Sequence, residues 1–248
     1  MTSLTPRQLL QAWDAQQKMY IEFRENRTRC MMDILAGLAK KLDHPLRVLD
    51  VCCGPGSLSN AVTQRFGDAS CVGIDRDPVL MRLFRETTPH PDRIEIVDVD
   101  LREPGWAARW AEEPFDAAVS ATALHWFEPD ELTRVHQDIA SVLTPGGILL
   151  NADHLFFDKA TEPFLAELAP AERDRTEAQM RDDGAMSWQE WTQPWPCLDG
   201  SPRPRSSDAV GRTRTSLGRS APSSISPQCA RPDSPRLLRS GSGSTTGS

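Results

Sequence analysis

A glycine-rich turn directly after an apolar run is the feature that most constrains this chain. The run Val48–Val51 suits a strand buried on both faces, and it contains Asp50. The turn Gly54–Gly56 then lets the backbone bend sharply and approach a ligand without a Cβ in the way. Ser57 can cap a helix whose free N–H groups would face that ligand. The pattern therefore predicts a cofactor-binding loop between a strand and a helix.

A second apolar run ends in an acid about two dozen residues beyond Asp50. The run Cys71–Asp75 reads as a buried strand, and its last carboxylate stands where doubly wound folds bind ribose hydroxyls. Asp77 can serve as the N-cap of the next helix. We therefore expect Asp75 and the neighbouring Arg76 to contact a cofactor.

The ligand that suits this loop is cationic and carries no phosphate. A loop for pyrophosphate needs a third glycine, where this chain has Ser59, and Asp50 would repel a phosphate. An acid beside the loop suits a positively charged amino acid instead. S-adenosylmethionine fits these conditions, because its ammonium and sulfonium groups are positive and its ribose needs a carboxylate.

The chain resembles the class I S-adenosylmethionine-dependent methyltransferases from about residue 13 to about residue 191. The motifs that carry the resemblance are VLDVCCGPGSLS, VGIDRDP, VDVDLREPGW, FDAAVSATALHWF and LTPGGILL. The sequence ALHW is similar to that of bacterial small-molecule methyltransferases of the trans-aconitate type. The resemblance implies methyl transfer from S-adenosylmethionine to a small molecule. Cys52 departs from the family, which usually has glycine there, so its backbone contact with the methionine part of the cofactor can be altered.

Alternating hydrophobic periods predict an α/β fold with a doubly wound, Rossmann-like parallel sheet. Strands are expected near residues 47–52, 71–75, 94–99, 115–120 and 147–153, with helices between them. The resemblance implies the class I methyltransferase fold, with strand order 3-2-1-4-5 and a final antiparallel hairpin. No sequence after Asp153 alternates as the strands of that hairpin must, so we expect the chain to lack the hairpin.

Ligands of an open parallel sheet bind beyond the carboxyl ends of its strands. Those ends include Asp100, Leu101 and Ser120. Asp100 can accept a hydrogen bond at the adenine edge with Leu101 against the ring face; a solvated helix cap is the alternative. The candidate cofactor-binding residues are therefore Asp50, Cys52, Gly54, Gly56, Asp75, Arg76, Asp100, Leu101 and Ser120.

The segment after the fourth predicted strand leads toward the expected position of the methyl group. His125 is the candidate catalytic residue, because a His there could act as a general base. Holding donor and acceptor in line can by itself supply about 7 to 11 kcal/mol. We therefore favour His125 as a pocket wall or a hydrogen-bonding residue of the loop. Trp126 can line the substrate pocket or pack in the core.

Helices predicted within residues 1–42 would form a lid over the pocket, as the resemblance implies. Tyr20 and Arg24 are the candidate substrate and lid residues. Arg24 or Arg27 could pair with a carboxylate of the cofactor or of the substrate. A solvated helix face is the alternative for all three.

The composition changes abruptly near the end of the sequence. We expect a methyltransferase domain over residues 1–195 and a disordered tail, rich in Ser, Pro and Arg, over residues 196–248. The tail is either out-of-frame translation of a GC-rich gene, which we favour, or a natural flexible segment. Without the hairpin the fifth strand would be an exposed apolar edge, so we expect poor solubility and weak or no activity.

The charge distribution favours a small-molecule substrate over nucleic acid. The chain has 28 basic and 35 acidic residues, and eight Arg lie in residues 201–248, so the part before them is strongly acidic. No apolar stretch reaches the length of a membrane span and no signal peptide is seen, so a cytoplasmic enzyme without a membrane partner is expected. The cysteines lack metal-site spacing, so no metal is expected. The oligomeric state stays open.

Two other functions remain open. The unusual C-terminal sequence favours a truncated, non-catalytic cofactor-binding remnant. A NAD-dependent oxidoreductase is disfavoured by Asp50 and Ser59. The methyl acceptor is not readable from these residues, and only analogy with the trans-aconitate type favours a carboxylate or hydroxyl oxygen.

Overall fold

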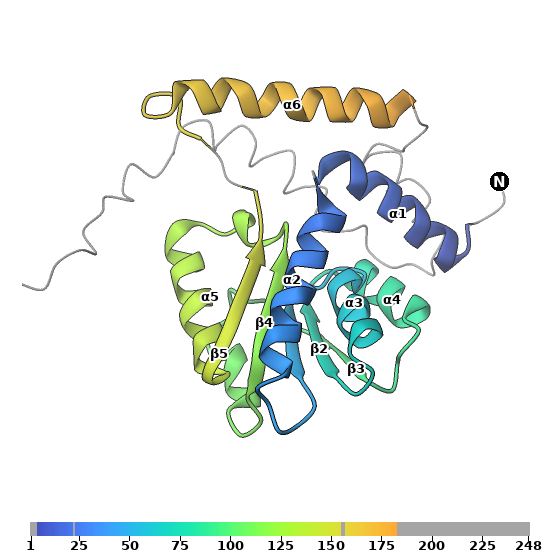
Figure 1. Cartoon of the computed structure of the whole chain (residues 1–248), viewed down its shortest axis with the longest axis vertical. Helices are drawn as coiled ribbons and strands as arrows, with labels where there is room; N and C mark the ends of the chain where they lie inside the picture. The colour runs from blue at the N-terminus through green and yellow to red at the C-terminus, as the bar shows by residue number, and fades with distance from the viewer. Residues whose placement is uncertain (1–3, 22, 155–156, 183–248) are drawn as a thin grey trace, which may run out of the picture.

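The computed structural model describes residues 4–21, 23–154 and 157–182, in which helices and strands alternate (Figure 1). The elements are, in chain order, α1 (Pro6–Tyr20), α2 (Arg24–Ala39), β1 (Arg47–Val51), α3 (Ser57–Arg65), β2 (Ser70–Asp75), α4 (Pro78–Thr87), β3 (Ile94–Asp98), η1 (Trp106–Trp110), β4 (Phe115–Ala121), η2 (Leu124–Trp126), α5 (Pro129–Ser141), β5 (Leu143–Ala152) and α6 (Pro163–Asp182). Among these described helices, none combines the length and the apolar character that crossing a membrane requires.

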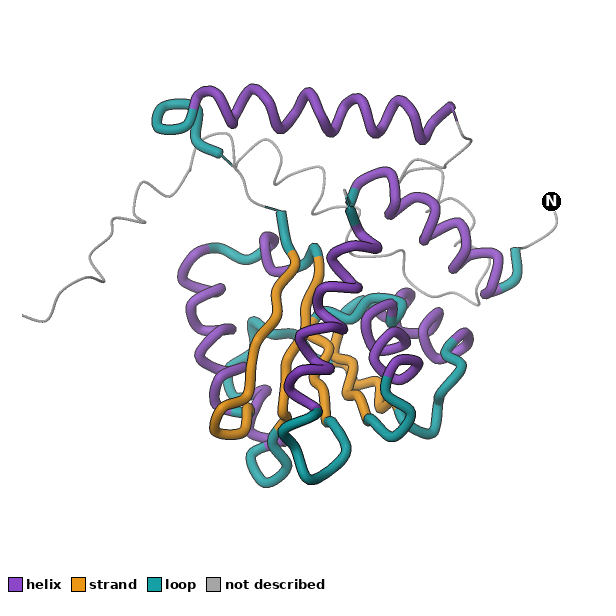
Figure 2. Tube along the Cα trace, viewed as in Figure 1, coloured by secondary structure: helices purple, strands orange, loops and turns teal. Residues whose placement is uncertain are grey.

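The five strands form one parallel sheet in the order β3-β2-β1-β4-β5. The α/β class and the strand order predicted from the sequence are therefore confirmed. Figure 2 shows the strands side by side with helices packed around them. The chain direction across the sheet reverses between β1 and β4, and ligands of such sheets bind beyond the carboxyl ends of the strands at this switch point.

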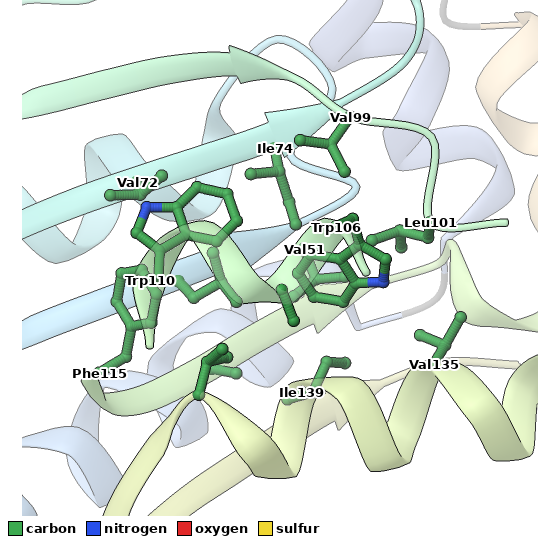
Figure 3. Packing of buried hydrophobic residues seen from close by; sticks show 14 of the residues in the cluster. Val51, Val72, Ile74, Val99, Leu101, Trp106, Trp110, Phe115, Val135 and Ile139 are labelled. Atoms are coloured by element: carbon green, nitrogen blue, oxygen red, sulfur yellow. The ribbon is translucent and has the colours of Figure 1, made fainter. Parts of the chain in front are cut away.

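Each face of the sheet has its own hydrophobic core. On one face, Leu49 of β1 packs in a cluster with η1 and α5, and Figure 3 shows Trp106 and Ile139 of this cluster. On the other face, Val48 of β1 packs in a cluster with α2, α3 and Phe84 of α4. Neighbouring residues of a strand point to opposite faces, so a strand covered on both sides needs an unbroken apolar run.

Local signals set the starts of α1 and α4, and the cap of α4 is the one predicted from the sequence. Thr5 caps α1 by accepting a hydrogen bond from the N–H of Gln8, whose side chain accepts one from the N–H of Thr5. Asp77 caps α4 by accepting hydrogen bonds from the N–H groups of Val79 and Leu80.

Helix α3 begins differently from the prediction. Its N-cap is Gly56, in a left-handed conformation with φ of 84°, and Ser57 is its first helical residue. The prediction that Ser57 caps α3 is therefore wrong. The reason is that the last left-handed residue of the turn is Gly56, one position before Ser57. Only glycine adopts this conformation without steric strain.

Helix α1 packs outside the layers around the sheet. Leu9 and Trp13 of α1 contact Val79, Leu80 and Leu83 of α4, and α1 also contacts α6. Figure 1 shows α1 and α6 on the same side of the molecule, beyond one end of the strands. The predicted N-terminal helices are thus α1 and α2, and their action as a lid stays a prediction.

Strand β5 is an edge of the sheet in the described part of the chain. It starts at Leu143, earlier than the predicted start near residue 147, and its pairing with β4 is irregular between Phe115 and Ala117. The apolar residues 148–150 of β5 are half-buried. No further strand follows β5 in residues 153–154 and 157–182. The predicted boundary at residue 195 and the predicted tail over 196–248 lie outside the described residues.

Candidate functional site

The predicted cofactor loop joins β1 to α3 through three residues with left-handed backbone. Cys52, Gly54 and Gly56 have φ values of 57°, 52° and 84°. A Cβ on Gly56 would lie 2.0 Å from Cε2 of Phe84. Gly54 and Gly56 therefore supply conformations that side chains disfavour, whereas Cys52 adopts the same conformation despite its side chain.

Cys52 offers a direct test of backbone strain in this loop. We expect the Cys52→Gly variant to be more stable than Cys52→Ala by about 1 kcal/mol, because alanine keeps the strained Cβ and glycine does not. Both variants remove the sulfur atom, so the comparison isolates the backbone conformation. Urea unfolding of the two variants measures the difference. Equal stability, or a more stable alanine variant, would show that residue 52 is not strained.

Asp50 lies inside the protein and joins β1 to α3. It is 1% exposed, and its Oδ2 accepts hydrogen bonds from the N–H and the Oγ of Ser59 at 2.9 and 2.6 Å. Burial raises the pKa of Asp50 to about 6. The two hydrogen bonds from Ser59 act to lower this pKa, and the charge of Asp75 adds a smaller upward contribution. Contact of Asp50 with a cofactor stays a prediction.

The raised pKa of Asp50 predicts a pH-dependent contribution to stability. The folded chain keeps the Asp50 proton up to about pH 6, whereas the ordinary pKa is 3.8. Between these two pH values the folded chain keeps the Asp50 proton, whereas the unfolded chain has lost it. The free energy of unfolding therefore falls as the pH rises through this range. We expect Asp50→Asn to gain stability relative to the native sequence over this range and to show a constant difference above it. Urea unfolding from pH 4 to pH 7 measures the difference, with the exposed Asp92→Asn as control. A difference that does not vary with pH would contradict the assignment.

Asp75, at the end of β2, is tied to the glycine loop. Its Oδ2 accepts the N–H of Gly54 and its Oδ1 accepts the N–H of Asp77, both at 2.8 Å. Burial raises the pKa of Asp75, and the two backbone hydrogen bonds act in the opposite direction. Since a carboxylate offers about four acceptor positions, this fixed group can also accept hydrogen bonds from ligand hydroxyls.

A cavity of about 910 Å³ lies beside the ends of β2 and β3. Its lining residues are Arg76, Pro78, Asp98, Val99, Asp100, Glu103, Trp106 and Arg109. Asp100 accepts hydrogen bonds from Nη1 of Arg76 and from the N–H of Arg102, both at 3.0 Å. Burial opposes ionisation of Asp100, but these hydrogen bonds and the two arginine charges hold its pKa below the ordinary value. The structure thus brings the predicted residues Arg76 and Asp100 together in one cavity.

Leu101 and Ser120 are buried and do not line the cavity. Leu101 is buried with Val51 and Trp106 in one core cluster (Figure 3). Ser120 is fully buried, and its Oγ donates a hydrogen bond to the carbonyl of Val51 at 2.9 Å. These contacts hold the strand ends together, and contact of either residue with a cofactor stays a prediction.

Arg24 connects the N-terminal helices to the start of α3. Its Nη2 donates hydrogen bonds to Oδ1 of Asp14 at 2.9 Å and to Oγ of Ser57 at 2.8 Å. The carboxylate partner of Arg24 in this structure is therefore Asp14 of α1. Nη1 of Arg27 is buried and has no hydrogen-bond partner among the described atoms. Tyr20 is the last residue of α1, and its side chain lies outside the described part.

His125 and Asp153 form a hydrogen-bonded pair beyond the ends of β4 and β5. Nδ1 of His125 lies 2.5 Å from Oδ1 of Asp153, and the N–H of His125 donates to Oδ2 of Asp153 at 3.0 Å. The two side chains are only 12% and 8% exposed. The ring centroids of Trp126 and His125 lie 4.6 Å apart. Trp126 is 36% exposed, so it lies at the surface rather than in the core. Sequence reasoning missed Asp153, because its contact with His125 depends on the register between β4 and β5 and not on any local spacing.

Comparison with known proteins identifies the central part of the chain. Residues 48–147 match the family described as "Methyltransferase domain", and this stretch belongs to that family. The chain is 32% identical over 181 residues to a protein of Rhodopseudomonas palustris (strain BisB18) named "Trans-aconitate 2-methyltransferase", covering 69% of this chain and 63% of that protein. It is 32% identical over 167 residues to a protein of the same name from Azoarcus sp. (strain BH72), covering 64% and 60%. The chain thus spans about three fifths of the length of these curated relatives.

Among solved structures, the chain is similar to CalS10, described as an amino pentose methyltransferase from Micromonospora echinaspora with SAM bound. The two share 23% identity with a TM-score of 0.42, over 50% of this chain and 49% of that one.

Proposed function

We propose that this chain, whose residues 48–147 are a methyltransferase domain, transfers the methyl group of S-adenosylmethionine to a small molecule. The observation that carries the proposal is the hydrogen bond between Gly54 and Asp75. It joins the left-handed loop after β1 to the carboxylate after β2 in one unit, at the switch point of the sheet. Such a unit suits a ligand with a ribose and a positively charged amino acid.

The donor set of the site fits this cofactor better than a dinucleotide. Asp50 lies near the end of β1, and Asp75, Asp98 and Asp100 lie at or just after the ends of β2 and β3. Arg76 is already paired with Asp100. Such an acidic environment would repel a pyrophosphate. In the proposed complex Asp75 binds the ribose, the loop from Cys52 to Gly56 holds the methionine part, and the cavity beside Asp100 takes the adenine.

The bound cofactor supplies an electrophilic methyl group on a sulfonium ion, and the chain supplies its position. The acceptor is proposed to be a small molecule with an oxygen nucleophile. The name shared by the two curated relatives, which specifies trans-aconitate, supports this class. In-line orientation of the two reactants supplies most of the rate enhancement in this proposal.

Titration calorimetry of the full chain with S-adenosylhomocysteine and with NAD tests the proposal. We expect S-adenosylhomocysteine to bind at least tenfold more tightly than NAD, because the acids of the site accept a charged ammonium group and repel a pyrophosphate. Tighter binding of NAD would refute the proposal and support an oxidoreductase. Binding of S-adenosylhomocysteine without methyl transfer to any acceptor would support the non-catalytic remnant.

A further inference from the structure

Arg102 lies between two carboxylates that come from different parts of the chain. Its backbone N–H donates a hydrogen bond to Oδ1 of Asp100 at 3.0 Å, and its Nη1 lies 3.9 Å from the same oxygen. Its Nε donates a hydrogen bond to Oε1 of Glu131 at 3.2 Å. The guanidinium carbon also lies 4.8 Å from the ring centroid of Phe127, a cation–π contact. Arg102 therefore connects Asp100 to the residues around the start of α5.

One end of this connection belongs to the proposed cofactor site. The described residues that line the cavity include Asp100 but neither Arg102 nor Glu131. The other oxygen of Asp100 accepts a hydrogen bond from Arg76. Arg102 thus holds the carboxylate proposed to contact adenine from outside the cavity.

The charge of Arg102 also acts on the cofactor loop. Burial raises the pKa of the Cys52 thiol well above its ordinary value, and the charges of Asp75 and Asp50 add to this rise. The charge of Arg102 opposes it, and so does that of Arg76. Since the interaction between two charges weakens with distance, this effect places Arg102 near the loop as well as near Asp100.

The other end of the connection holds the turn before α5. Oε2 of Glu131 accepts a hydrogen bond from the N–H of Glu128 at 3.1 Å, and the Glu128 side chain caps the N–H of Glu131. Phe127 and Glu128 come directly after η2. Arg102 contacts Phe127 directly and Glu128 through Glu131, so it holds the chain where η2 ends.

This turn lies next to the proposed methionine subsite. It follows β4, and β4 pairs with β1, whose loop holds the methionine part in the proposed complex. A methyl acceptor has to meet the sulfonium group at this edge of the sheet. Residues 122–128, here called the acceptor turn, therefore lie beside the position proposed for the acceptor.

We infer that Arg102 is a positioning residue, which couples a ligand bound at Asp100 to the order of the acceptor turn. This inference rests on the proposed function and deepens it. Ion pairs and hydrogen bonds carry energetic coupling between sites, and here they run from Asp100 through Arg102 to Glu131. A ligand that fixes the Asp100 carboxylate also fixes the guanidinium group, and this group holds the turn. Since coupling is reciprocal, an ordered acceptor turn in return favours the cofactor.

A matched control exists at the opposite end of the sheet. Nη1 of Arg47 donates a hydrogen bond to Oε2 of Glu113 at 3.0 Å, and its guanidinium carbon lies 4.7 Å from the ring centroid of Phe115. Arg47 begins β1, whereas the cavity lies beside the carboxyl ends of the strands. Arg47→Gln therefore removes the same kinds of contact as Arg102→Gln without touching Asp100.

Amide hydrogen exchange of the full chain, with and without saturating S-adenosylhomocysteine, tests the coupling. In the native chain we expect the ligand to slow exchange of the Trp126 and Phe127 N–H groups, which form the backbone hydrogen bonds of η2. The expected slowing is about three- to fivefold, the effect that one half-buried ion pair can support. At equal occupancy, Arg102→Gln should lose this slowing but keep the slowing in residues 52–59. Arg47→Gln should keep both.

Glu131→Gln tests the connection from its other end without changing the cavity. The Glu131 carboxylate accepts hydrogen bonds on both oxygens, from Arg102 and from Glu128. A glutamine side chain has one oxygen, so it can satisfy only one of these donors. We expect Glu131→Gln to reduce the slowing at Trp126 and Phe127. Combining it with Arg102→Gln should add little, because both changes break the same connection.

The exchange rates decide between coupling and a structural role alone. Equal slowing of the acceptor turn in the native chain and in Arg102→Gln would overturn the inference. Slowing in residues 52–59 of the native chain without slowing in the acceptor turn would also overturn it. If the native chain does not bind S-adenosylhomocysteine, the proposed function fails, and the coupling fails with it. The positioning role is then judged without ligand, since Arg102→Gln should exchange faster at Phe127 than Arg47→Gln, and equal rates would refute that role too.

Discussion

The Gly56→Ala variant is expected to be less stable than the native chain by about 3 kcal/mol or more. A left-handed conformation costs an alanine roughly 1 to 2 kcal/mol, and overpacking a core costs about 1 to 3 kcal/mol. Both apply here, because Gly56 has a φ of 84° and its added Cβ would lie 2.0 Å from Cε2 of Phe84. Phe84 is fully buried beneath the loop, so the ring has little room to move. Urea unfolding measures the loss.

Two other glycines separate the causes of this loss. Gly54→Ala has the same kind of backbone, with φ of 52°, but its Cβ comes no closer than 3.9 Å to Leu80. It should lose only the conformational part. Gly67→Ala, with nothing within 4 Å, should be nearly neutral. Combining Gly56→Ala with Phe84→Leu should recover part of the loss relative to the sum of the single variants. A Gly56→Ala chain as stable as Gly54→Ala would refute the packing argument.

The sheet could be predicted from the sequence because its signals are local and repeated. A strand covered on both faces shows a nearly continuous apolar run, as Val48, Leu49 and Val51 do beside the single acid Asp50. The caps Thr5 and Asp77 also act within three residues of themselves. The order of the strands came from the family resemblance, which the pairing of β1 with both β2 and β4 confirms.

The parts that could not be predicted depend on residues far apart in the chain. Ser57 reads as a helix cap, but its Oγ accepts a hydrogen bond from Arg24, which also binds Asp14 of α1. Asp153 joins His125 only because β4 and β5 pair in a register that the sequence does not encode locally. The early start of β5 was missed because Pro145 and the two glycines after it are typical of a loop.

The strain at the site was also hidden from sequence reasoning. Cys52 departs from the glycine that is usual in the resembling family, whereas the sequence carries no signal at Thr122. Both are left-handed in the structure. Residue type alone does not reveal such a conformation, because the surrounding fold imposes it.

Replacement of Asp75 by alanine is expected to weaken S-adenosylhomocysteine binding by roughly 10- to 100-fold, because a hydrogen bond to a charged group contributes about 1.5 to 3 kcal/mol. The same change leaves the N–H groups of Gly54 and Asp77 without their partner, so the loop also loses support. Asp98→Ala is the matched control, since Asp98 is the register partner of Asp75 on β3 and lines the adjacent cavity. It should lose much less affinity.

A pair of smaller ligands separates ribose recognition from loop support. Adenosine carries both ribose hydroxyls, and 2′,3′-dideoxyadenosine carries neither. If the Asp75 carboxylate accepts those hydroxyls, the native chain should prefer adenosine and Asp75→Ala should lose that preference, whereas a disordered loop would weaken both ligands equally. Competition against labelled S-adenosylhomocysteine measures the two affinities. An Asp75→Ala chain that still discriminates between the two nucleosides would place the ribose contact elsewhere, even if its overall affinity had fallen, because discrimination depends on the hydroxyls alone.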